Sequence, residues 1–108
     1  MPEQTMLDKL LKILDDNQAI DIQTIDVRNQ TAITDYMIVA SGRASRHVKA
    51  IAEKTMEEMK TAGMPAISSA GLDSGDWVLV DFGDYILHVM QPDSRQFYNI
   101  EGLWVDHH

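Results

Sequence analysis

The clearest pattern of hydrophobic and polar positions lies in residues 77–90, where it predicts a β-hairpin. Gly83-Asp84 fits a two-residue turn that begins with glycine, and such a turn fixes how the two strands pair. Because side chains alternate across a strand, this register separates two faces. One face is wholly apolar and is expected to be core: Val78, Val80, Phe82, Tyr85, Leu87 and Val89. The opposite face is mixed: Trp77, Leu79, Asp81, Ile86, His88 and Met90.

Apolar residues at helical spacing predict two helices before the hairpin. The first covers residues 5–16, with Thr5 as its N-cap and Asp8, three residues later, in a pattern close to a capping box. The second is the longest in the chain. It is expected to start at Ser45, interpreted as its N-cap, and to stop at Gly63.

Three further strands are predicted. Residues 22–27 form the first of them, and residues 34–41 form the second, whose nearly continuous apolar run is typical of burial on both faces in the middle of a sheet. A third is expected around residues 66–69. This order predicts a single compact α/β domain over residues 1–108, with a mixed β-sheet packed with helices. Because the long helix follows a strand, a parallel crossover to a later strand is also expected.

A short helical segment rich in aromatic residues follows the hairpin. Trp104 lies at roughly helical spacing from Phe97 and is expected to seal the domain. Arg95 has two candidate partners in the sequence. It can form an ion pair with Glu101, which would fix this last segment, or it can pair with Asp81 on the hairpin.

Composition limits the classes of function. Seventeen acidic residues against nine basic ones give a net charge of −8, which disfavours a direct nucleic-acid site and favours a basic protein partner. Acidity that merely keeps a protein in solution is the commoner explanation. The absence of cysteine excludes disulfides and cysteine-based metal sites. No apolar run reaches the length of a membrane span, so the protein is expected to be cytoplasmic, without a membrane partner.

The mixed face of the hairpin leaves three functions open. Trp77 suits the centre of a docking surface, since tryptophan is enriched in interface hot spots. Asp81, His88 and Glu101 would be the acid and base groups of a nucleotide- or metal-dependent enzyme. The face can also join two copies of the chain as a dimeric adaptor. No paired-histidine spacing or nucleophile elbow accompanies these residues, so we expect no catalytic residue, metal or cofactor.

The chain resembles the ribosomal silencing factor family (RsfS, also called Iojap-like) from its first helix to Trp104. The motifs that carry the resemblance are Asp35-Tyr36, Ser41-Gly42, Ser45-Arg46-His47-Val48, Ile51-Ala52, Asp76-Trp77-Val78, Gly83-Asp84, His88-Val89, and the closing Arg95, Tyr98, Glu101, Leu103 and Trp104. One position departs from the family pattern. Ala70-Gly71 stands where members commonly have Glu-Gly, so if that glutamate contacts a partner, this chain lacks the contact.

The resemblance implies a shape like that of nucleotidyltransferases, without their catalytic residues. It implies binding to the large ribosomal subunit at its protein numbered fourteen. The bound factor would block joining of the small subunit and repress translation in starvation or stationary phase. It also implies a tendency of the isolated protein to form homodimers. On the residues of this chain, we expect the docking surface to consist of Trp77, Asp81, His88, Arg95 and Tyr98.

Overall fold

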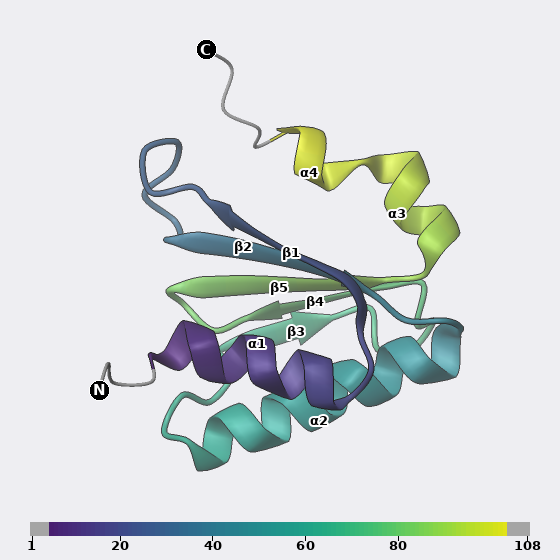
Figure 1. Ribbon diagram of the computed structural model, residues 1–108, viewed down its shortest axis with the longest axis horizontal. Helices are drawn as coiled ribbons and strands as arrows, with labels where there is room; N and C mark the ends of the chain where they lie inside the picture. Colours follow the sequence, from purple (N-terminus) through teal and green to yellow (C-terminus); the bar gives the residue numbers. More distant parts are fainter. Residues whose placement is uncertain (1–4, 104–108) are drawn as a thin grey trace.

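A five-stranded mixed sheet forms the centre of the computed structural model, which describes residues 5–103 (Figure 1). The strands are β1 (Ile20–Asp26), β2 (Tyr36–Ser41), β3 (Ser68–Ala70), β4 (Trp77–Asp81) and β5 (Tyr85–Met90). Their order across the sheet is β1-β2-β5-β4-β3. The central pair, β2 and β5, runs parallel, and the other neighbours are antiparallel. The predicted mixed sheet and parallel crossover are therefore confirmed.

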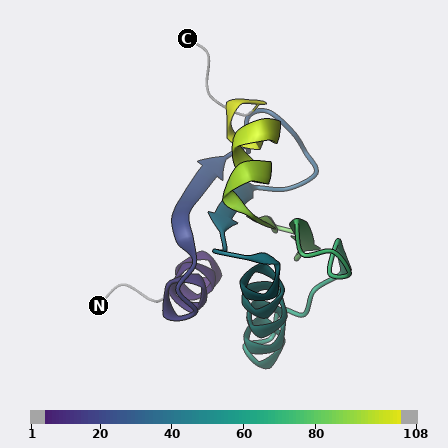
Figure 2. The same ribbon diagram turned by 90° about the vertical axis from the view of Figure 1, so that its right-hand side faces the viewer.

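Four helices accompany the sheet within the described range: α1 (Met6–Asp16), α2 (Ser45–Thr61), α3 (Pro92–Tyr98) and α4 (Ile100–Leu103). The two long helices, α1 and α2, lie side by side and cover one face of the sheet (Figures 1 and 2). The two short helices, α3 and α4, lie on the other side (Figure 2). Consequently α1 and α2 cover one face of the sheet along its length, whereas the shorter helices α3 and α4 cover a smaller part of the other face.

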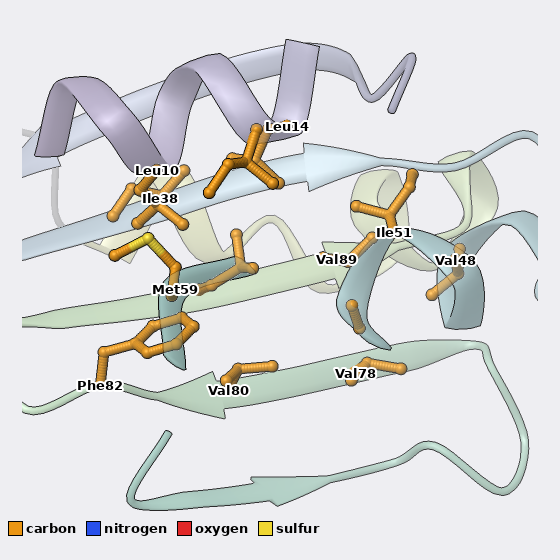
Figure 3. Packing of buried hydrophobic residues seen from close by; sticks show 13 residues of the cluster. Leu10, Leu14, Ile38, Val48, Ile51, Met59, Val78, Val80, Phe82 and Val89 are labelled. Atoms are coloured by element: carbon orange, nitrogen blue, oxygen red, sulfur yellow. The ribbon is translucent and has the colours of Figure 1, made fainter. Parts of the chain in front are cut away.

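The main core lies between the sheet and the two long helices (Figure 3). Its fully buried side chains come from every layer and include Leu10, Leu14, Ile38, Val48, Ile51, Met59, Val78, Val80, Leu87 and Val89. Phe82 is buried with them, and the partly buried Tyr85 packs against this cluster. The apolar hairpin face is thus core, as predicted. A smaller cluster of Val39, Met90 and Ile100, on the opposite face, connects α4 to the sheet.

The register of the hairpin agrees with the prediction from its turn. Val78 pairs with Val89, and Val80 pairs with Leu87. The amide of Phe82 donates to the carbonyl of Tyr85 across the turn, at 2.9 Å. The predicted burial of the second strand is also confirmed, because the last four residues of β2 are buried in the middle of the sheet.

The starts of α1 and α2 differ from each other in how they are capped. The predicted capping box of α1 is present: the amide of Asp8 donates to Thr5 Oγ1 at 3.0 Å, and the Asp8 carboxylate accepts from the amide of Thr5. The prediction that Ser45 caps α2 is wrong, since Ala44 is the N-cap and Ser45 is already helical. Instead, a histidine in the first turn of α2 contacts the backbone just before the helix. Nδ1 of His47 accepts a hydrogen bond from the backbone N–H of Arg43 at 3.0 Å.

The segment after the hairpin is two short helices rather than one. Asn99 adopts the left-handed conformation, with φ of 47°, and this ends α3 before α4 begins. Phe97, in the last turn of α3, is 81% exposed. Phe97 therefore does not belong to a buried stripe. Trp104, which was expected to seal the domain, lies outside the described residues.

Candidate functional site

The site predicted from the sequence lies on the face of the sheet turned away from α1 and α2, which we call the second face. Residues that pair directly on neighbouring strands share a face, so the register defines its rows. The rows are Trp77, Met90 and Ser41; Leu79, His88 and Val39; and Asp81, Ile86 and Met37. The hairpin residues Trp77, Leu79, Asp81 and Ile86 are half-buried, whereas His88 and Met90 are buried. The second face is therefore partly open and mainly apolar.

Trp77 and His88 are joined by a hydrogen bond on this face. The indole Nε1–H of Trp77 donates to Nδ1 of His88 at 3.0 Å, and the two ring centroids are 5.8 Å apart. An indole nitrogen can only donate, so Nδ1 of His88 must carry a lone pair. The imidazole is only 4% exposed, and burial lowers the pKa of His88 to about 4. His88 is therefore neutral at pH 7, and its proton is on Nε2.

The Nε2–H of His88 is buried and has no hydrogen-bond partner among residues 5–103. A buried donor without a partner costs about 1–3 kcal/mol, whereas a typical hydrogen bond contributes about 0.5–1.5 kcal/mol. The cost of burying this donor is therefore of the same order as the contribution of the hydrogen bond from Trp77.

Three aromatic rings form a continuous group at this end of the second face, and we call Trp77, Tyr98 and Phe97 the aromatic cluster. The rings of Trp77 and Tyr98 lie 4.9 Å apart between centroids, and Phe97 meets Tyr98 edge-on at 5.1 Å. Tyr98 is 53% exposed and Phe97 is 81% exposed. Phe97 was not among the predicted docking residues, because its helical spacing to Trp104 indicated a shared buried side of one helix.

Arg95 fixes α3 against the same end of the sheet. Its Nη1 donates to Ser41 Oγ at 3.0 Å and to the carbonyl oxygen of Ile20 at 3.3 Å. Ser41 belongs to the row of Trp77, so the guanidinium connects the helix that carries Tyr98 to the strand row that carries Trp77. The side chain of Glu101, its other predicted partner, lies outside the described residues.

Asp81 lies at the opposite end of β4, beside the hairpin turn. Its Oδ1 accepts a hydrogen bond from the amide of Gly83 at 2.7 Å. Four strand residues, or about 13 Å, separate it from the row that Arg95 contacts. The predicted pairing of Asp81 with Arg95 is therefore not formed. The structure brings Trp77, His88, Arg95 and Tyr98 together, and it places Asp81 on the same face but away from them.

The acid and base groups of this face do not converge. Across the part of the chain that the structure describes, no three His, Asp or Glu side chains are grouped so that they could hold a metal ion. The carboxylate of Asp81 is engaged in its own turn, and the buried imidazole of His88 is engaged by Trp77. Nor does any helix in that part have the length and apolar character needed to cross a membrane. The arrangement offers an exposed aromatic surface rather than a cluster of reactive groups.

Comparison with known proteins gives consistent matches. The sequence model of a family described as "Ribosomal silencing factor during starvation" matches residues 1–108. The chain is 46% identical over 91 residues to the ribosomal silencing factor RsfS of Zymomonas mobilis, covering 84% of this chain and 68% of that protein. It is 35% identical over 101 residues to the mouse protein "Mitochondrial assembly of ribosomal large subunit protein 1", covering 91% of this chain and 44% of that protein.

A solved structure has the same fold. The crystal structure of a Chromobacterium violaceum protein superimposes with a TM-score of 0.91 at 40% sequence identity, covering 96% of this chain and 87% of that one. The likeness therefore extends over nearly the whole of this chain and most of the other.

Proposed function

The chain belongs to the ribosomal silencing factor family, and from this premise we propose that it binds the large ribosomal subunit and prevents the small subunit from joining it. The contact on the large subunit is the ribosomal protein numbered fourteen. The protein acts in the cytoplasm and represses translation in starvation or stationary phase. It does so as a steric obstacle, with no catalytic step. The name of the mouse relative, which refers to the ribosomal large subunit, supports this choice of partner.

The observation that carries the proposal is the exposed aromatic cluster on the second face. Large rings that fill a pocket and exclude water contribute most of the energy at many protein interfaces. Phe97 and Tyr98 are exposed on α3, and Trp77 lies beside them with its ring orientation fixed. The half-buried Leu79 and Ile86 extend the apolar area along the hairpin. In this proposal Trp77 is the anchor, and Tyr98 and Arg95 complete the contact from α3.

Size and charge support a steric mechanism on a basic partner. The molecule measures 37 × 35 × 25 Å along its principal axes, so one bound copy is large enough to separate two surfaces that must meet. The net charge of −8 complements a basic ribosomal protein better than it complements bare RNA. Asp81 is included in the docking surface because it adds a carboxylate to the second face at the end opposite to the aromatic cluster.

The decisive experiment compares two exposed apolar residues at opposite ends of the sheet. Phe97→Ala removes a ring of the aromatic cluster, and Ile67→Ala removes a side chain that is 70% exposed next to the hairpin turn. Because both side chains are exposed, neither change should alter the melting temperature much. Phe97→Ala is expected to weaken co-sedimentation with purified large subunits by about tenfold or more, whereas Ile67→Ala should not.

The same preparations test the steric mechanism. The unmodified protein should keep separated subunits from joining, and Phe97→Ala and Trp77→Ala should restore joined ribosomes. Asp81→Lys should weaken binding by reversing a charge on the second face. Equal binding by all variants would exclude the second face as the contact.

A second copy of the chain also fits this face as a homodimer, in which case added large subunits should convert dimers into bound monomers.

A further inference from the structure

We propose that His88 is the positioning residue of the docking surface: its Nδ1 holds the Trp77 ring in the orientation that the large subunit binds. This inference rests on the proposed function. It differs from the expectation that His88 itself contacts the partner, because the imidazole is only 4% exposed. His88 would act through the ring of Trp77, which is half-buried and reaches the surface.

The geometry explains why Trp77 needs such a hold. Trp77 is the first residue of β4, and its ring contacts the rings of both His88 and Tyr98. Tyr98 is itself on a short helix and is more than half exposed, so its ring offers a face for contact but no directed bond to Trp77. The hydrogen bond to Nδ1 is directional and comes from a side chain buried in the row of Val39 and Leu79. It fixes the rotation of the indole.

The burial of a polar ring argues that His88 is present for this purpose rather than for packing, because removing its nitrogens from water costs free energy and Nδ1 has Trp77 as its partner. An apolar side chain of similar size would fill the same place between Val39 and Leu79 without removing polar nitrogens from water. The imidazole is thus a poorer core residue than leucine would be, and the property that leucine lacks is the acceptor for Trp77. Ordering a large side chain before docking removes part of the entropy that binding would otherwise have to overcome.

The test uses two variants of nearly equal shape. His88→Asn retains an oxygen acceptor close to the position of Nδ1, and His88→Leu replaces that amide by methyl groups. If His88 positions Trp77, the variant that is more stable should be the one that binds large subunits more weakly. His88→Leu should be the more stable of the two in urea unfolding but should bind large subunits about fivefold to tenfold more weakly than the unmodified protein. His88→Asn should be the less stable and should bind within about twofold to threefold.

A spectroscopic signal reports the bond itself. In the unmodified protein, the ¹⁵N shifts of the His88 ring should show the tautomer with its proton on Nε2, and the Trp77 indole proton should be shifted and protected from exchange. The indole signal is assigned with Trp77→Phe. It should remain protected in His88→Asn and become exchangeable in His88→Leu. An indole signal that is identical in both variants would overturn the inference.

A double-mutant cycle keeps the inference testable if one variant is unstable. In the background of Trp77→Phe, which has no indole donor, His88→Leu should cause no further loss of binding. An equal loss with and without the indole would show that His88 does not act through Trp77. Binding of the unmodified protein is the separate control. If it does not co-sediment with large subunits, the proposed function fails; if it does, and His88→Leu binds as well, only the positioning role fails.

Discussion

Burial of a single histidine connects the site to the stability of the whole fold. The pKa of His88 is about 4 in the folded protein, against 6.5 for an unperturbed imidazole. Between these two pH values the unfolded chain binds a proton at this position and the folded protein does not. Acidification therefore shifts the equilibrium towards the unfolded chain. Acidification also removes the hydrogen bond from Trp77, because a protonated Nδ1 cannot accept it.

This gives a pH dependence with a defined window. Above about pH 6.5, His88 should have no effect on how the free energy of unfolding depends on pH. Between pH 6.5 and pH 4, the free energy of unfolding should fall by about 3 kcal/mol in total because of His88, and below pH 4 His88 should lower it no further. The carboxyl group of Asp26 titrates at a lower pH than His88, since its hydrogen-bonded ion pair with Arg28 lowers the pKa of Asp26 to about 2. Urea unfolding at several pH values measures the effect. His88→Leu should lack this part of the pH dependence, and parallel curves for the two proteins would contradict the prediction.

At the scale of the elements, the loop between β3 and β4 determines where β4, and with it Trp77, begins. Gly71 has a φ of +90°, and a Cβ at this position would collide with the carbonyl oxygen of Trp77. Glycine is therefore required here both by the backbone conformation and by the close approach of β4. A side chain at position 71 would displace the backbone of Trp77, and with it the indole that His88 holds.

Two glycine substitutions separate the cost of a positive φ from the cost of a collision with a neighbouring strand. Gly63 also has a positive φ, of +97°, but a Cβ there would meet nothing within 4 Å. Gly63→Ala should therefore show the conformational cost alone, about 1 kcal/mol, in urea unfolding. Gly71→Ala adds the collision and should destabilise the fold by about 3 kcal/mol or more and weaken binding to large subunits. Equal losses of stability for the two variants would show that the approach of Trp77 to Gly71 is not a tight contact.

Local patterns predicted the elements well, and contacts between distant elements were the part they missed. The two-residue turn at Gly83-Asp84 and strict alternation were enough to assign both faces of the hairpin. The break at Asn99 was missed because left-handed asparagine carries no periodic signal. The bonds of Trp77 to His88 and of Arg95 to Ser41 depend on side-chain rotamers and on strands that pair across the sheet. Sequence spacing does not encode such contacts.

At the scale of the whole molecule, the charge of −8 should guide the encounter with a basic partner. Screening shortens the Debye length from about 30 Å at 0.01 M salt to about 8 Å at 0.15 M. Association with large subunits should therefore slow by about tenfold or more over this range at constant Mg²⁺, while dissociation should change much less. Stopped-flow or surface binding measures both rates. Phe97→Ala should show the opposite behaviour, with faster dissociation and an unchanged salt effect on association.

The parallel pairing of β2 with β5 also imposes an order on synthesis. β2 and its partner are separated in the chain by α2, β3 and β4, so the centre of the sheet is a contact between distant segments. While the chain is being translated, α1, β1 and β2 emerge first, but the strand that completes their sheet is the last one made. The second face is completed last, because β4, β5 and α3 supply most of it. A nascent copy therefore cannot present the complete second face to any partner until β5 and α3 have emerged.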